Sequence, residues 1–191
     1  MLKLMLTALV LLACQFPALA EEAGTREVRH ALTFPGKNAQ YLHIQSIFPV
    51  NSEWIELSLP SWSPGSYLIR DYAGNLERME AEDSGGRQLP VTKIAKNRWR
   101  IPTSGIELLT LDYDVWAGRK NVAESWVESD FALLNGAGLF LYNEQTREWP
   151  QKVSVELPAG WSTIHTALPA DQGQGSFIAS DYDVLVDNPI L

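Results

Sequence analysis

Apolar and polar residues alternate along several segments of this 191-residue chain, and a period of two is typical of β-strands with one buried face. In residues 152–157, Val153, Val155 and Leu157 alternate with three polar residues. The same pattern predicts further strands at 28–34, 41–48, 54–59, 106–116, 139–142 and 176–179. Only residues 67–82 favour a helical turn or two. We therefore predict an all-β fold, a single antiparallel β-sandwich.

The first twenty residues have the features of a secretory signal peptide. Lys3 precedes an apolar run, and Ala18-Leu19-Ala20 suits signal peptidase. The run is too short to cross a bilayer of about 30 Å, and no later stretch predicts a transmembrane segment. We expect cleavage after Ala20 and a periplasmic or secreted protein. The alternative is a lipid anchor at Cys14, because residues 11–14 resemble a lipobox, but the Ala-x-Ala site favours ordinary cleavage.

Composition excludes several classes of function. The formal net charge is −8, and the basic residues are scattered, so nucleic acid is not an expected partner. Cys14 is the only cysteine, and it lies within the predicted signal peptide. The exported chain would therefore have neither a disulfide nor a thiol nucleophile and would depend on its core.

Motifs for the common catalytic centres are missing from the sequence. There is no His-Glu-x-x-His zinc string, no Gly-x-Ser-x-Gly elbow and no phosphate-binding glycine loop. Of the three histidines, His30 falls on the apolar face of its strand and is expected to be buried and hydrogen-bonded, whereas His43 and His165 fall on polar faces. A pair of carboxylates brought together by the fold stays open as a hydrolytic site.

Residues 59–75, Leu-Pro-Ser-Trp-Ser-Pro-Gly-Ser-Tyr-Leu-Ile-Arg-Asp-Tyr-Ala-Gly-Asn, combine turn-forming, aromatic and charged residues. Pro64-Gly65 favours a tight turn, with Trp62 and Tyr67 on either side. In a structural interpretation, the two aromatic residues close one end of the sandwich and Arg70 pairs with Asp71 or a neighbouring carboxylate. In a functional interpretation, the loop holds a peptide or another domain by stacking and by hydrogen bonds from the guanidinium group.

These residues resemble the Trp-Thr-Pro-Gly-Ser-Tyr-x-Ile-Arg segment in the amino-terminal domain of the glycyl aminopeptidase family of zinc metallopeptidases. Residues 131–142 resemble that family's Phe-Asn-Gly-Thr-x-Leu strand, and residues 180–189 resemble the Asp-Tyr-Asp-x-Leu-Val-Asp-x-Pro segment that closes the domain. The resemblance runs from near residue 27 to the end of the chain. Departures from the family pattern are Ser63, Gly74 and Ala137, and the last puts a side-chain hydroxyl role at its strand in doubt.

The resemblance implies a non-catalytic, β-rich domain that precedes a thermolysin-like catalytic domain, often followed by a PDZ domain. It divides the chain into a signal peptide (1–20), the sandwich (21–187) and the start of a linker (188–191). Zinc is expected only in the catalytic domain, which is the expected partner in cis or in trans, and a peptide is a further partner. The residues expected to contact that domain or a substrate are Trp62, Tyr67, Arg70, Asp71 and Asn135.

Two of these residues have a specific expected chemistry. Asp71 would bind the free α-amino group of a peptide, and Arg70 would pair across the domain boundary. Asn135-Gly136 also has a purely structural interpretation as a turn or bulge.

Two other functions stay open. The first is a free-standing extracytoplasmic module whose exposed aromatic residues bind a peptide or glycan. The second is an independent hydrolase that acts through carboxylates.

Overall fold

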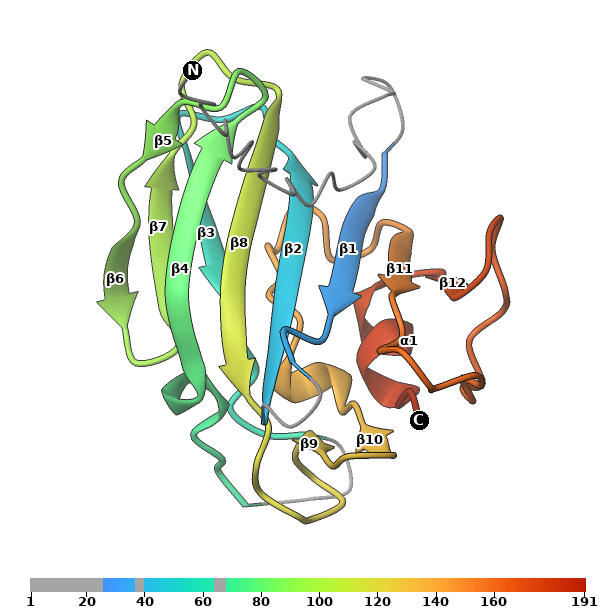
Figure 1. Ribbon diagram of the computed structural model, residues 1–191. Helices are drawn as coiled ribbons and strands as arrows, with labels where there is room; N and C mark the ends of the chain where they lie inside the picture. Colours follow the sequence, from blue (N-terminus) through green and yellow to red (C-terminus); the bar gives the residue numbers. More distant parts are fainter. Residues whose placement is uncertain (1–25, 37–39, 64–67) are drawn as a thin grey trace, which may run out of the picture.

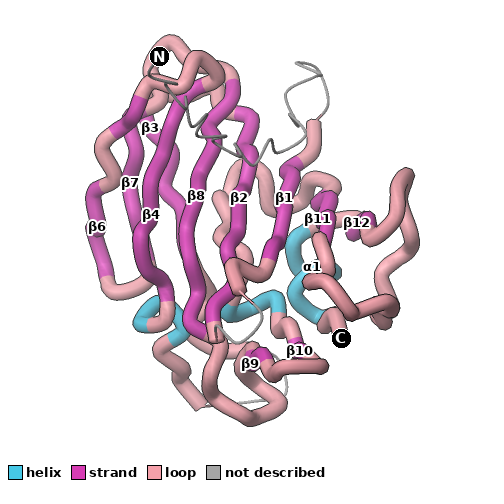
Figure 2. The backbone as a smooth tube through the Cα atoms, viewed as in Figure 1, coloured by secondary structure: helices cyan, strands magenta, loops and turns pink. Residues whose placement is uncertain are grey.

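Two stacked β-sheets make up most of the computed structural model, which describes residues 26–36, 40–63 and 68–191 (Figures 1 and 2). The larger sheet has the strand order β12-β11-β1-β2-β8-β4-β5, and the smaller has the order β3-β7-β6. The predicted all-β sandwich is confirmed. The strands are β1 (Val28–Thr33), β2 (Tyr41–Pro49), β3 (Trp54–Ser58), β4 (Leu76–Asp83), β5 (Gln88–Leu89), β6 (Thr92–Ala95), β7 (Arg98–Pro102), β8 (Leu108–Trp116), β9 (Trp126–Val127), β10 (Ala132–Leu133), β11 (Gln151–Val155) and β12 (Ser176–Ala179).

Strand pairing in both sheets is antiparallel with one exception. Strand β1 pairs with β11 in parallel, and Val28 lies opposite Gln151. Strands β9 and β10 form a separate two-stranded ribbon at one end of the sandwich (Figure 1). The larger sheet therefore places an early strand beside a late one.

The core lies between the inward faces of the two sheets. Strands β2 and β8 bury the side chain at every second position, as the alternation predicted, and all of these side chains are apolar except Ser46 of β2. Residues 139–141 are also buried in the core, and the next residue, Tyr142, forms an isolated bridge with Ser58 of β3. Core side chains with less than 2% of their surface exposed include Phe48, Phe140, Leu42, Ile44, Leu57, Ile101, Leu109, Leu111 and Tyr113.

The described chain has three short helices, η1 (Tyr72–Gly74), η2 (Gly136–Gly138) and α1 (Tyr182–Asp187), and the last two were not predicted. The predicted strand at 139–142 is wrong, because Phe140 N donates to Gly136 O and turns the chain just before it, leaving only Tyr142 in a bridge. The helical turn expected within 67–82 is η1, after which the chain becomes β4. Helix α1 begins at an aspartate cap, since Asp181 Oδ1 accepts from Val184 N at 2.8 Å.

Several predictions fall outside the described residues. These are the signal peptide (1–20), Cys14, the Pro64-Gly65 turn and Tyr67. Within the described part of the chain, none of the helices has the length and apolar character needed to cross a membrane.

Two glycines with the same backbone conformation differ in their surroundings and give a matched test of the fold. Gly105 and Gly175 both have φ +75°, but a Cβ at Gly175 would lie 2.6 Å from Val155 O, whereas nothing lies within 4 Å at Gly105. We expect Gly105→Ala to lower the free energy of unfolding by about 1 kcal/mol and Gly175→Ala by about 2 kcal/mol. Urea unfolding followed by circular dichroism measures both, and equal losses would show that the β11–β12 turn relaxes without cost.

Candidate interaction site at the loop end of the sandwich

The described parts of the conspicuous segment at residues 59–75, which are 59–63 and 68–75, belong to the loop between the smaller sheet and the larger one. It leaves β3, passes through η1 and enters β4 at the lower end of the molecule in Figure 1. Arg70 N donates to Ser61 O at 2.6 Å, which brings the two arms of the loop together. Asn97 Nδ2 donates to Leu59 O at 2.6 Å and thereby ties the loop to the β6–β7 turn.

Tyr72 fixes the far arm of this loop to two other segments. Its side chain is buried, and its hydroxyl donates to Ala123 O at 2.9 Å. Gly138 of η2 lies against its ring, since a Cβ there would be 3.3 Å from Tyr72 Cδ1. The loop, residues 121–125 and η2 therefore form one packed unit.

Arg70 and Asn135 both reach residues 121–125, so the structure brings these two predicted site residues to one segment. Arg70 Nη1 lies 3.6 Å from Glu124 Oε1. Asn135 N donates to Ser125 Oγ at 2.9 Å, and Asn135 Nδ2 donates to Val122 O at 3.4 Å. Asn135 also caps η2, because its Oδ1 accepts from Ala137 N.

Asp71 and Trp62, unlike Arg70 and Asn135, are not connected to residues 121–125 by a hydrogen bond or ion pair in the described part of the chain. The Asp71 carboxylate faces Lys96 Nζ at 3.0 Å, and both side chains are largely exposed. The ion-pair partner of Arg70 is thus a neighbouring carboxylate, Glu124, and not Asp71. Trp62 leaves half of its surface in contact with solvent.

Glu124 is the charged residue of this site that the sequence analysis missed. It is 6% exposed and lies between Arg70 and Arg119, whose Nη1 is 3.4 Å from Glu124 Oε1. Within the described part of the chain, its Oε2 is buried without a hydrogen-bond partner. A buried carboxylate needs nearby positive charge, and the two guanidinium groups supply it. An acidic residue between Ala123 and Ser125, in a segment without alternation, gives no sequence signal of burial.

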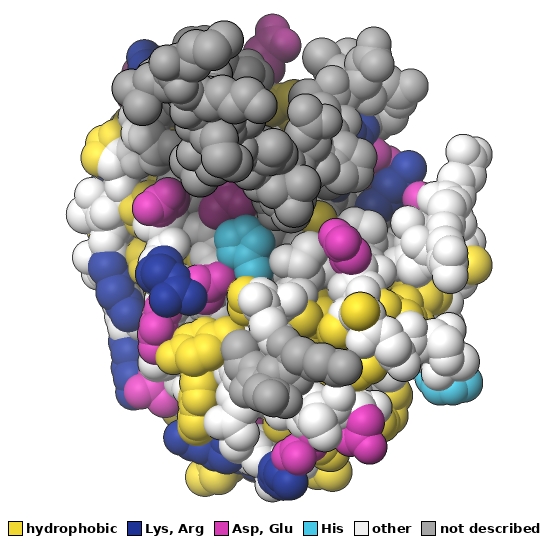
Figure 3. Space-filling model, in the orientation of Figure 1, with side chains coloured by type: hydrophobic (Ala, Val, Ile, Leu, Met, Phe, Trp, Pro, Cys, Tyr) yellow, Lys and Arg dark blue, Asp and Glu magenta, His cyan; other side chains and the backbone are white. Residues whose placement is uncertain are grey.

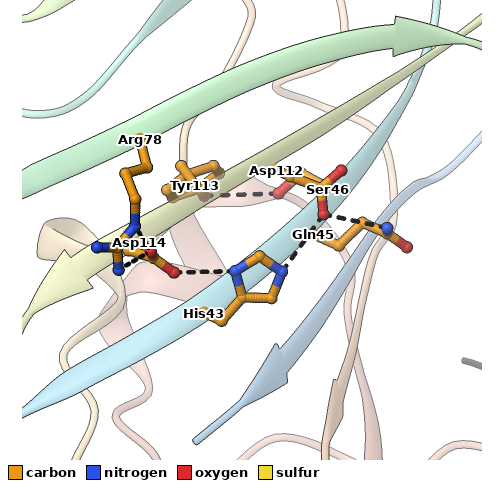
Figure 4. A network of polar contacts seen from close by, with 7 residues as sticks. All are labelled: His43, Gln45, Ser46, Arg78, Asp112, Tyr113 and Asp114. Carbon is orange, nitrogen blue, oxygen red and sulfur yellow. Dashed lines mark hydrogen bonds and ion pairs between the residues drawn. The ribbon is translucent and has the colours of Figure 1, made fainter. Parts of the chain in front are cut away.

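A second polar network lies on the outward face of the larger sheet (Figure 4). His43 Nδ1 is 2.9 Å from Asp114 Oδ1, and its Nε2 is 3.4 Å from Asp112 Oδ1. Gln45 Nε2 donates to Asp112 at 3.1 Å, and Arg78 pairs with Asp114. These are cross-strand pairs of β2, β8 and β4, and charges of both signs are interspersed on this face (Figure 3).

Ser46 and Tyr113, also drawn in Figure 4, belong to the buried face of the same two strands. Burial raises the pKa of Tyr113. Its hydroxyl therefore stays protonated and donates to Leu139 O at 2.9 Å. This hydrogen bond joins β8 to the buried residues 139–141.

No group of three or more His, Cys, Asp or Glu side chains in the described residues is placed to hold a metal ion. The loop-end site instead combines exposed apolar side chains with ion pairs that fix the loops, which is the composition of a protein interface.

The family model of the peptidase M61 N-terminal domain matches residues 29–191. The chain belongs to this family. The resemblance seen in residues 59–75, 131–142 and 180–189 is thereby confirmed. This peptidase N-terminal domain has no match among curated protein sequences.

One solved structure agrees with the family assignment. An aminopeptidase N family protein from Idiomarina loihiensis superposes with a TM-score of 0.80 at 29% identity, over 85% of this N-terminal domain chain and 28% of that chain. An M1 zinc metallopeptidase from Deinococcus radiodurans has a TM-score of 0.47 at 12% identity, over 87% of this chain and 41% of that one. The present chain thus spans less than half the length of either protein.

Proposed function

We propose that this chain is the non-catalytic amino-terminal domain of a glycyl-aminopeptidase-like zinc metallopeptidase. It packs on a catalytic domain, in cis or in trans, and forms one wall of the peptide cleft. The observation that carries the proposal is the match to the peptidase M61 N-terminal domain over residues 29–191. The Idiomarina loihiensis relative supports it, because this chain covers only 28% of that protein.

Zinc belongs to the catalytic domain in this proposal. The domain described here contributes shape and contacts, and its function is independent of any metal of its own. The basic, apolar and small-residue series in residues 1–20 supports export to the periplasm or the extracellular space.

A chimaera tests the proposal directly. Residues 29–191 replace the matched region of the Idiomarina loihiensis protein, and the chimaera is compared with that protein intact and with its remainder alone. We expect the chimaera to unfold in one cooperative transition and to hydrolyse peptides with a free amino terminus, whereas the remainder alone has lost most of this activity. The intact relative is the positive control.

Two independent unfolding transitions without peptidase activity would contradict the proposal. The alternative would then be a free-standing module that binds a peptide or glycan, which the half-exposed Trp62 favours. Binding of peptide and glycan arrays to the isolated chain, compared with Trp62→Ala, measures that alternative.

A further inference from the structure

Exposed apolar side chains are concentrated at one end of this sandwich. Within the described residues, eight large hydrophobic side chains are exposed, and six of them lie in the loops and chain end beside the β9–β10 ribbon. Ile69 and Val122 are 72% and 89% exposed. We call these six the loop-end surface: Trp62, Leu68, Ile69, Val122, Phe131 and Leu191.

Hydrogen bonds and an ion pair connect the members of this surface step by step. The Arg70–Ser61 hydrogen bond places Ile69 next to the arm that carries Trp62. The Arg70–Glu124 ion pair then places residues 121–125 beside that arm, and the Asn135–Val122 hydrogen bond joins the same residues to the start of η2.

The remaining members join the surface through the β9–β10 ribbon. Phe131 packs on Trp126 of β9, with ring centroids 5.1 Å apart. Ile190 pairs with Leu134, just after β10, and Leu191 pairs with His165.

Buried side chains fix the backbone of the loop-end surface, although its apolar side chains are exposed. Tyr72, Glu124 and Ser125 are each at least nine-tenths buried directly beneath it. A loop that served only as a connection would not need an ion pair at a buried carboxylate, because burying a charge costs free energy that pairing only partly returns. The arrangement instead resembles a protein interface, in which exposed apolar side chains lie on loops whose conformation is fixed before binding.

The position of the last residue points to the occupant. Leu191 lies at the same end of the sandwich as the exposed loops (Figure 1). In the Idiomarina loihiensis protein, the region that matches this chain is 28% of the length. A chain that continues from Leu191 therefore starts next to the loop-end surface.

We infer that the loop-end surface is the face that docks on the catalytic domain, with Ile69 and Val122 at its centre. This inference rests on the proposed function and adds the location of the interface. The charged outward face of the larger sheet and the outward face of the smaller sheet then stay exposed to solvent in the assembled enzyme.

Hydrogen exchange locates the interface. Amide exchange is compared between the isolated chain and the chimaera described above. We expect the amides at 68–71 and 121–123 to exchange at least about tenfold more slowly in the chimaera. Ile69→Asp should abolish that slowing, because a carboxylate would be buried against the partner. Ile94→Asp is the matched control, since Ile94 is also exposed but lies on β6 of the smaller sheet.

The outcomes separate this inference from the proposed function. The loop-end surface would be ruled out as the interface if the amides of β6 and β7 exchanged more slowly in the chimaera, and if Ile94→Asp but not Ile69→Asp removed that effect. The proposed function would still stand. No slowing anywhere, together with two unfolding transitions, would overturn both. Sedimentation of the isolated chain tests whether the surface binds a second copy of this chain instead. Self-association that Ile69→Asp abolishes, together with unchanged amide exchange in the chimaera, would assign the surface to a second copy.

Discussion

Replacing Tyr72 with Ala is expected to lower the free energy of unfolding by about 3–5 kcal/mol, the usual cost of removing a large buried aromatic side chain. The ring packs against Gly138, and the hydroxyl donates to Ala123 O at 2.9 Å. The substitution therefore leaves a cavity where the loop, residues 121–125 and η2 meet. Urea unfolding followed by tryptophan fluorescence measures the loss.

Tyr72→Phe is the matched variant, because it keeps the ring and removes only the hydroxyl. We expect it to cost about 1 kcal/mol, the net value of one hydrogen bond. The comparison separates packing from hydrogen bonding at this junction. Equal losses for the two variants would mean that the ring contributes nothing, which is incompatible with its contact with Gly138.

Lowering the pH is expected to destabilise the protein through His30, by about 3 kcal/mol between pH 7 and pH 4. Burial lowers the pKa of this imidazole from about 6.5 to about 4. The unfolded chain therefore takes up a proton first as the pH falls, and stability decreases between those two pKa values. Urea unfolding at intervals from pH 7 to pH 4 measures the slope.

The two ring nitrogens of His30 contact Ser46 Oγ at 2.8 Å and Gln151 Oε1 at 3.2 Å, so the neutral ring is held by polar groups inside the core. His30→Leu should remove the His30 contribution to the slope, even though it costs stability at pH 7. His165→Gln serves as the control, because His165 is exposed. A slope that survives His30→Leu unchanged would assign acid sensitivity to the carboxylates instead.

Alternation of apolar and polar residues predicted the strands that have one face on the core and the other face exposed. Strands β2 and β8 follow this rule closely, because one face lies on the core and the other carries polar side chains. Strands β6 and β7 were missed because they are short, with four and five residues. Helix α1 was missed as well, although Asp181 three residues before Val184 is a recognisable cap.

At the loop-end site, Arg70 and Asn135 could be singled out from their motifs, whereas Glu124 could not. The position of Glu124 depends on Arg70 and Arg119, and its ion pair with Arg70 spans more than fifty positions of the chain. Such long-range charge pairing leaves no local pattern. The Asp71–Lys96 ion pair could likewise not be predicted from the sequence, because it joins the loop to the distant β6–β7 turn.

The parallel pairing of β1 with β11 also constrains when the domain can assemble during synthesis. Val28 leaves the ribosome more than a hundred residues before Gln151, its partner, so the edge of β1 that does not pair with β2 stays open until most of the chain is made. Contacts between such distant residues slow folding, and an open edge invites pairing with other chains. A nascent chain of this kind can complete its larger sheet only after β11 is made. A product that ends before β11 would leave that edge of β1 open to aggregation.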